Sequence, residues 1–137
     1  MKIGIIGVGI QGFRYLQLIL NDYKEHEVVA ITRINEERKN KIKDYINDIK
    51  IYETDELLFN AVDKKEISLD AVIITTPHLR HEYDAIEAFK RNIMVLCDKP
   101  CGAYLRQGLN MLNESHNIRY GYIFHQRAYP IYQNYMI

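Results

Sequence analysis

Apolar residues along the chain fall into short continuous runs, separated by longer stretches in which they recur every three or four positions. Continuous runs rich in β-branched residues are typical of strands buried on both faces, as in parallel sheets. The alternating aromatic residues of the last run indicate a strand with one more polar face. The predicted strands are Ile3–Val8, Glu27–Thr32, Lys50–Tyr52, Ala71–Thr75, Ile93–Cys97 and Arg119–His125.

The intervening stretches show the spacing of amphipathic helices. Asn35 and Thr54 are typical helix caps, and Asn92 is typical of a left-handed residue at a helix end. The predicted helices run from Gly12 to about Tyr23, from Asn35 to Ile49, from Thr54 past Val62, from about Leu79 to Arg91, around Leu105–Leu112, and onward from Pro130. The side chains expected to face inward from the middle helices are Ile42, Tyr45, Ile46, Ile49, Leu57, Leu58, Ala61, Val62, Tyr83, Ile86 and Phe89, and the later helix is marked by Leu105, Leu109 and Leu112.

Strands that alternate with helices of this length predict βαβ units. The expected fold is therefore α/β, a doubly wound parallel sheet within three α/β/α layers. Ligands of such sheets bind outside the carboxyl ends of the strands. That edge is where the candidate functional residues of this chain fall.

The first strand ends in the motif Gly7-x-Gly9-x-x-Gly12, and a helix follows at once. Gly7 permits a tight turn, Gly9 lets a pyrophosphate approach the backbone, and Gly12 lets the helix pack closely on the strand. The helix start adds free N–H groups and a positive dipole end. This order predicts a Rossmann-type dinucleotide site; the alternative is a merely structural glycine turn. The predicted contacts are Gly7, Val8, Gly9, Ile10, Gln11 and Gly12.

Arg33 stands at the end of the second strand, where a carboxylate would accept hydrogen bonds from the ribose hydroxyls of NAD. An arginine instead pairs with a 2′-phosphate or stacks on adenine. The expected cofactor is therefore NADP or NAD, with NADP favoured, and Arg38 is a possible second contact. The alternative is that Arg33 is a solvated strand end.

The fourth strand leads into Thr75-Thr76-Pro77, followed by His78 and His81. The two hydroxyls are expected to line the nicotinamide-ribose side of the site, although an ordinary turn would use the same residues. The two histidines could share a helix face. No third ligand has suitable spacing, so no metal site is predicted.

Asp98-Lys99-Pro100 ends the fifth strand. A lysine beside a nicotinamide can donate a proton or a hydrogen bond to a carbonyl oxygen, and Asp98 would hold its ammonium group in place. The alternative is a salt-bridged surface lysine at a turn. Cys97 and Cys101 flank the motif, and burial explains Cys97 better than zinc binding does.

Composition narrows the possible partners. Among 137 residues, 18 basic side chains balance 18 acidic ones, so nothing indicates binding to nucleic acid or to an anionic membrane. No apolar run approaches the roughly 20 residues of a membrane span. Two cysteines without a disulfide framework, and a first strand at the N-terminus, lead us to expect a cytoplasmic protein.

Four stretches in this order resemble the N-terminal domain of the glucose–fructose oxidoreductase / inositol dehydrogenase (Gfo/Idh/MocA) family. They are Gly7–Gly12, Ala71–His81, Val95–Pro100 and Arg127–Pro130. The resemblance implies an oxidoreductase that moves hydride between NAD(P) and a sugar, cyclitol or related carbonyl or alcohol. It implies that Lys99 is the catalytic lysine, and that the cofactor contacts include Thr76, Pro77, His81, Asp98 and Arg127. We also expect cofactor contacts from the remaining residues of the two strand-end motifs, Thr75, His78 and Pro100.

The chain departs from the family pattern in three ways. Asp98 replaces the usual glutamate, Arg33 replaces the usual acid, and the family's second, substrate-binding domain is absent. We expect residues 1–125 to form the cofactor domain and residues 126–137 to begin the connection to that domain. The 137 residues alone are expected to be inactive and to bind substrate only with the missing domain; the alternative is a non-catalytic dinucleotide-binding or regulatory module.

Without the second domain, the aromatic residues near the C-terminus are expected to leave an exposed surface. They are Tyr120, Tyr122, Phe124, Tyr129, Tyr132 and Tyr135. Large exposed apolar patches tend to be contact sites. We therefore expect a homo-oligomer.

Overall fold

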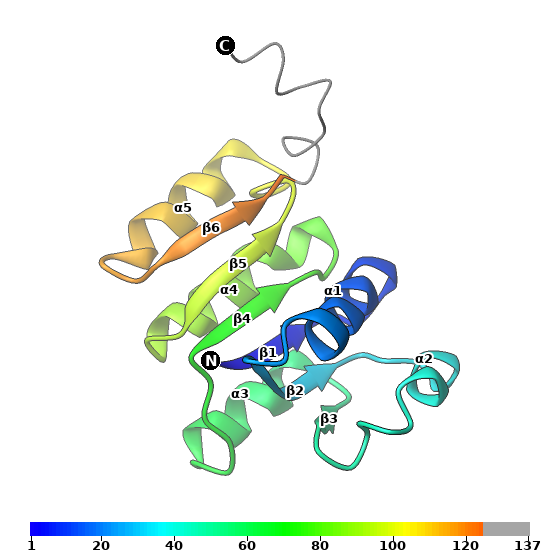
Figure 1. The fold of residues 1–137 in the computed structure, drawn as a ribbon. Helices are drawn as coiled ribbons and strands as arrows, with labels where there is room; N and C mark the ends of the chain where they lie inside the picture. The colour runs from blue at the N-terminus through cyan, green and yellow to red at the C-terminus, as the bar shows by residue number, and fades with distance from the viewer. Residues whose placement is uncertain (125–137) are drawn as a thin grey trace.

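The computed structural model describes residues 1–124, which are built around one six-stranded sheet (Figure 1). The strands are β1 (Lys2–Ile6), β2 (Glu27–Thr32), β3 (Lys50–Tyr52), β4 (Ala71–Ile74), β5 (Met94–Asp98) and β6 (Tyr120–Ile123). All five pairings are parallel, in the order β3-β2-β1-β4-β5-β6. The chain runs outward from β1 to β3, returns to β4 beside β1, and runs outward again. This confirms the predicted doubly wound sheet, with its switch point between β1 and β4.

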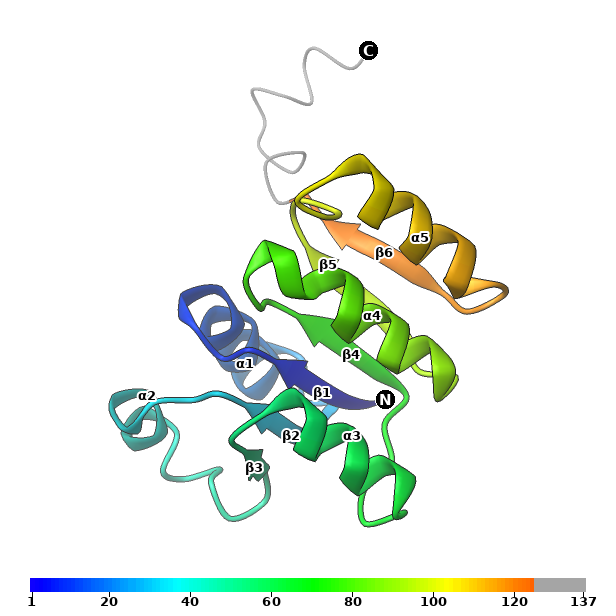
Figure 2. The same ribbon diagram turned by 180° about the vertical axis from the view of Figure 1, so that it is seen from behind.

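Helices cover both faces of the sheet and complete the three expected layers. They are α1 (Ile10–Asp22), α2 (Glu36–Lys41), α3 (Asp55–Asp63), α4 (His81–Lys90) and α5 (Leu105–Ser115), with a short 3₁₀ turn η1 (His78–Arg80) before α4. Helix α1 lies on one face, and α3, α4 and α5 lie side by side on the other (Figure 2). Each face has its own apolar cluster, centred on Leu16 under α1 and on Phe59 and Phe89 under α3 and α4.

The predicted helix from Asn35 to Ile49 is wrong beyond Lys41. Asn35 caps α2 as expected, because its Oδ1 accepts the Arg38 N–H at 2.9 Å. The segment after Lys41 folds into successive turns with hydrogen bonds to the residue three positions earlier. These turns bury Ile42 and Ile49 and half-bury Ile46, whereas Tyr45 is exposed, so the prediction that Tyr45 faces inward is wrong. The chain follows a tighter path here than an α-helix, which changes the faces that its side chains occupy.

Helix α5 lies where Leu105, Leu109 and Leu112 predict a helix, and it turns these leucines toward solvent. Its leucines are exposed, and its buried side chains are Gln107, Met111 and Ser115. Gln107 faces inward because its Oε1 accepts the backbone N–H of Ala103 at 2.8 Å, which satisfies a donor at the helix start. The exposed leucines are Leu105, Leu109 and Leu112.

Two further inward-facing predictions fail for a related reason. Leu57 and Tyr83 are exposed. The buried faces of α3 and α4 start at acidic or imidazole side chains rather than apolar ones, and the helical spacing from those side chains leaves Leu57 and Tyr83 on the exposed faces. Asp55 and Asp84 are fully buried in their place. Asn92, in contrast, has the predicted left-handed conformation, with φ of 57°.

The aromatic residues of β6 are less exposed than expected. Tyr120 and Tyr122 pack beneath α5, with their hydroxyls 3.9 and 4.0 Å from the Met111 sulfur. Tyr120 also makes an edge-to-face contact with Phe89. Phe124 is exposed, and Tyr129, Tyr132, Tyr135 and the helix expected from Pro130 lie outside the described residues. No helix within residues 1–124 is long and apolar enough to cross a membrane.

Candidate functional site

The glycine turn is held in one conformation by contacts on both sides. Gly7 has φ of +89°, and a Cβ there would lie 2.8 Å from the Thr76 side chain. The Gly7 N–H donates to Thr32 Oγ1 at 2.9 Å, and the Gly7 carbonyl accepts from Thr75 Oγ1 at 2.5 Å. A Cβ at Gly12 would lie 2.4 Å from the Gly7 carbonyl oxygen. Helix α1 can therefore approach the turn this closely only with glycine at both positions.

The start of α1 differs from the starts of α2 and α3. Asn35 and Thr54 cap those two helices with side-chain oxygens. Gly9 at the start of α1 offers no side-chain cap, and the first turn of α1 has no acidic residue. A Cβ at Gly9 would meet nothing within 4 Å. The positive end of a 13-residue helix thus faces open space, which suits the pyrophosphate of a dinucleotide.

An open cleft of about 630 Å³ joins this helix start to the other strand ends. Lys99 stands at the β5 side of the cleft and Arg33 at the β2 side. The sequence-predicted residues that line it are Gly7, Gly9, Ile10, Gln11, Arg33, Thr75, Thr76, Pro77, His78, His81, Asp98 and Lys99.

Four of the predicted contacts do not line the cleft. Val8 is fully buried, and Gly12 serves packing. Arg38 sits in α2, and Pro100 follows the cleft-lining lysine. Arg127 lies outside the described residues.

The hydroxyls of Thr75 and Thr76 point into the protein. Thr75 Oγ1 donates to the Gly7 carbonyl, and Thr76 Oγ1 donates to the buried Asp84 carboxylate at 2.7 Å. Both residues line the cleft, while the protons of both hydroxyls are donated to groups within the protein. The two hydroxyls instead hold the exit of β4 against the glycine turn and α4.

His81 connects two of the cleft-lining loops. Its side chain is 1% exposed, with Nε2 2.8 Å from the Thr76 carbonyl oxygen and Nδ1 3.0 Å from the Pro100 carbonyl oxygen. The ring therefore fixes the turn after β5 relative to the exit of β4. His78 and His81 are neighbours, as the spacing predicted, with ring centroids 5.6 Å apart.

Arg33 has a buried partner that the sequence did not indicate. Its Nε lies 3.1 Å from both oxygens of Asp55, and its Nη2 lies 3.0 Å from one of them. The Asp55 side chain is fully buried, while that of Arg33 is 43% exposed. Arg33 is thus anchored on one edge and reaches the cleft, rather than ending freely in solvent.

Lys99 lies at the cleft without the predicted ion pair. Asp98 accepts the backbone N–H of Lys99 at 3.0 Å, so the carboxylate orders the turn rather than the ammonium group. Within residues 1–124 no carboxylate lies within 4.0 Å of the Lys99 ammonium. The Lys99 charge is therefore available to a bound group.

Within residues 1–124 no group of three or more His, Cys, Asp or Glu side chains is arranged so that it could hold a metal ion. Cys97 is buried, and burial raises the pKa of its thiol well above the usual range. Such a thiol is a packing residue and not a thiolate ligand.

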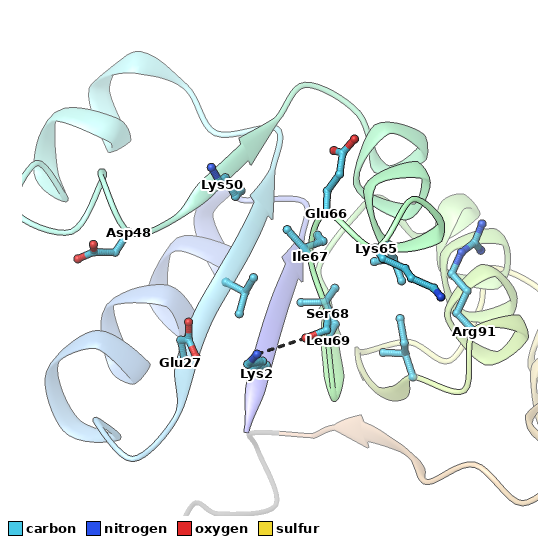
Figure 3. A pocket seen from close by; sticks show the side chains of 13 residues that line it. Lys2, Glu27, Asp48, Lys50, Lys65, Glu66, Ile67, Ser68, Leu69 and Arg91 are labelled. Carbon is cyan, nitrogen blue, oxygen red and sulfur yellow. Dashed lines mark hydrogen bonds between the residues drawn. The ribbon is translucent and has the colours of Figure 1, made fainter.

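A second hollow, of about 730 Å³, lies at the amino ends of the strands (Figure 3). Val29, Val62 and Ile67 form part of its apolar lining. Its charged side chains carry both signs: Lys2, Lys50, Lys65 and Arg91 stand beside Glu27, Asp48 and Glu66. This hollow is slightly larger than the cleft, but it offers no uncapped helix start and no single sign of charge to select a ligand.

Comparison with known proteins agrees with this geometry. The family described as "Oxidoreductase family, NAD-binding Rossmann fold" (GFO_IDH_MocA) matches residues 1–117. The chain belongs to this family. The 137 residues therefore contain the NAD-binding Rossmann domain of a Gfo/Idh/MocA oxidoreductase.

Inositol dehydrogenases are among the relatives of this Gfo/Idh/MocA chain. It is 33% identical over 101 residues to inositol 2-dehydrogenase of Salmonella typhimurium (strain LT2), covering 73% of this chain and 29% of that protein. It is 27% identical over 106 residues to the inositol 2-dehydrogenase/D-chiro-inositol 3-dehydrogenase of Lacticaseibacillus casei, covering 77% and 29%. The chain thus spans less than a third of the length of these relatives.

Solved structures share the fold. Myo-inositol 2-dehydrogenase from Lactobacillus plantarum superimposes with a TM-score of 0.82 and 20% identity, covering 98% of this chain and 39% of that one. The scyllo-inositol dehydrogenase of Lactobacillus casei with bound NAD(H) and scyllo-inositol gives 0.79 and 21%, covering 98% and 39%.

Sequence reasoning missed a cluster of four charged residues, Arg80, Asp55, Glu56 and Asp84, beside the cleft of this Gfo/Idh/MocA domain. Arg80 Nη2 lies 3.1 Å from Asp55, 2.9 Å from Glu56 and 3.3 Å from Asp84. Asp55 comes directly after the helix cap Thr54, where an acidic residue is common and does not by itself indicate a site. The usable signal for Asp55 was that it follows a short strand at the carboxyl edge, where a helix start is close to the site.

Asp84 supplies a pH-dependent test of this cluster. Burial raises the pKa of its carboxyl to about 7, opposed by the hydrogen bond from Thr76 Oγ1 and the charge of Arg80. Between about pH 4 and 7 the folded state then holds a proton that the unfolded chain has released. The free energy of unfolding should therefore fall as the pH rises through this range, by up to about 1.4 kcal/mol per pH unit.

Urea unfolding of the wild type and of Asp84→Asn from pH 4 to 7 measures this effect, because the other carboxylates titrate in both proteins. The stability of the wild type relative to Asp84→Asn should decline steadily with rising pH. An unchanged difference across the range would contradict the buried, neutral Asp84.

Proposed function

We propose that the cleft holds a nicotinamide dinucleotide with its pyrophosphate over Gly9, against the start of α1. The observation that carries this proposal is the uncapped start of α1, which faces open space while α2 and α3 have side-chain caps. Arg33 and Lys99 line the same cleft, so its two ends would receive the adenosine and the nicotinamide. The proposed contacts of the glycine turn are backbone groups from Gly7 to Gly12.

We further propose that NADP is preferred over NAD. Arg33 is anchored to Asp55 through Nε and Nη2, and within residues 1–124 no carboxylate is paired with its Nη1. A guanidinium group with a free edge suits a phosphate, whereas it cannot accept hydrogen bonds from ribose hydroxyls. Solved relatives include both kinds: a biliverdin reductase with NADP⁺ and the inositol dehydrogenase with NAD(H).

The proposed reaction is hydride transfer between nicotinamide and a sugar, cyclitol or related carbonyl or alcohol. Its support is the named activity of the inositol dehydrogenase relatives. Nicotinamide supplies the hydride chemistry when bound. Lys99 would donate a hydrogen bond or proton to the substrate oxygen, since its ammonium group has no carboxylate partner within residues 1–124.

The described residues provide no walls for the substrate beyond the cofactor cleft. Positioning of substrate accounts for roughly 7–11 kcal/mol of barrier lowering in favourable cases. We therefore propose that the 137 residues bind cofactor without appreciable turnover. Residues 1–125 would form the cofactor domain and 126–137 the connection to a substrate domain. A cytoplasmic location and homo-oligomers are part of the same proposal; the exposed leucine row on α5 favours association.

Titration of NADPH and NADH, followed by nicotinamide fluorescence or calorimetry, tests the cofactor proposal. The wild type should bind NADPH more tightly. Arg33→Asp should reverse the order, because a 2′-hydroxyl partner replaces a phosphate partner. Tighter binding of NADH by the wild type would contradict the NADP preference, and binding of neither nucleotide would contradict the site itself.

The role of Lys99 is tested in the presence of a substrate domain. The C-terminal domain of an inositol 2-dehydrogenase, fused to this chain or mixed with it, should yield polyol dehydrogenase activity that the 137 residues lack. Lys99→Ala should then lower kcat by about 10²–10⁴-fold with nearly unchanged cofactor affinity. Lys90→Ala, on the exposed side of α4, is the matched control. Equal activity of the Lys99→Ala and Lys90→Ala proteins would contradict this proposal, because Lys99 would then be a surface lysine without a role in the reaction.

A further inference from the structure

The buried carboxylate of Asp55 is connected to three side chains from two separate segments that form the cleft. Thr32 Oγ1 donates to it at 2.6 Å, Arg33 at 3.0–3.1 Å, and Arg80 Nη2 at 3.1 Å. Thr32 ends β2 and Arg33 follows it, whereas Arg80 closes the 3₁₀ turn that follows the cleft-lining Pro77. A fully buried charge with this many donors is fixed in place, because any movement of the carboxylate away from them would leave a charged group without a partner.

The link through Thr32 reaches the glycine turn itself. Thr32 Oγ1 accepts the Gly7 N–H at 2.9 Å, and a hydroxyl has only one proton to donate. That proton must go to Asp55, so the direction of the hydrogen-bond chain from Gly7 to the carboxylate is set. One acid at the start of α3 thereby places the glycine turn and Arg33 relative to one another.

Arg33 needs such an anchor. Its backbone has φ of 58°, a left-handed conformation that is uncommon outside glycine, and its side chain is partly exposed. A free arginine loses rotamer freedom when it binds a phosphate, whereas one already held by a carboxylate on its Nε–Nη2 edge loses little. Asp55 takes that edge and orders the remainder of the guanidinium group at the cleft.

We propose that Asp55 is a positioning residue that sets the preference for a 2′-phosphorylated dinucleotide by ordering Arg33. This inference rests on the proposed function. It assigns cofactor specificity to a residue that does not itself touch the cleft. The negative charge of Asp55 also acts on the pyrophosphate, but NADPH and NADH share that group. The ratio of their dissociation constants therefore isolates the effect on the 2′-phosphate.

Asp55→Asn is the direct test, since it keeps the size and one acceptor oxygen for Thr32 but turns an amide NH₂ toward the arginines. It should lower NADPH affinity about tenfold relative to NADH affinity. Asp63→Asn is the matched control: Asp63 pairs with Arg91 through two hydrogen bonds of 2.8 and 2.7 Å, at the other end of α3 and away from the cleft. It should leave the ratio of dissociation constants unchanged.

Arg33→Lys completes a double-mutant cycle, because lysine keeps the charge but lacks the planar fork that Asp55 holds. Arg33→Lys alone should reduce the preference for NADPH, measured as the ratio of the NADH and NADPH dissociation constants. Adding Asp55→Asn to Arg33→Lys should then change this ratio little further. Circular dichroism and thermal unfolding establish that each variant is folded; if Asp55→Asn does not fold, Arg33→Lys alone must still reduce the ratio.

The possible failures are distinguishable. If the wild type and Asp63→Asn bind neither nucleotide, the proposed function fails and this proposal fails with it. If the wild type binds both nucleotides and folded Asp55→Asn keeps the wild-type ratio, the proposed function stands and the role of Asp55 is overturned. Retention of the full ratio by Arg33→Lys would overturn it equally.

Discussion

The close approach of α1 to the glycine turn is the constraint on which the site depends. A side chain at position 12 would collide with the Gly7 carbonyl oxygen and the Thr75 hydroxyl, and these same two groups hydrogen-bond to each other. The contact fixes β1, α1 and the exit of β4 as one unit at the switch point of the sheet. The open space above Gly9 exists because this unit is rigid and because no side chain caps the helix.

Charge beneath the cleft is arranged around that unit. Asp55 and Asp84 are fully buried, and Arg80 lies against both of them, while the ion pair that Arg33 makes within residues 1–124 is with Asp55. Buried charges are costly unless they are paired, and removing one partner costs more than the pair contributes. The cluster is therefore better explained as a device that orders the cleft than as a source of stability. In the same way, His81 connects Thr76 to Pro100 and orders the turn that presents Lys99.

The doubly wound sheet and the position of the cleft were predictable because backbone periodicity and glycine spacing are local signals. The orientation of α5 was not, because Gln107 and Leu109 compete for the inward face and a backbone N–H at Ala103 decides the outcome. The pairing of Arg33 with Asp55 joins residues 22 positions apart, through a contact that no local pattern encodes. Sequence reasoning thus found the residues that line the cleft and missed those that hold them.

Gly9 permits the most direct measurement of the central claim that a dinucleotide lies over the start of α1. A Cβ there would meet no atom within 4 Å other than its own chain neighbours, so Gly9→Val should fold, with its melting temperature lowered only by the poorer helix cap that valine makes. The same side chain would occupy the space proposed for the pyrophosphate. Titration with NADPH and NADH should show binding to the wild type and loss of both in folded Gly9→Val. Undiminished binding of either nucleotide by Gly9→Val would contradict the account.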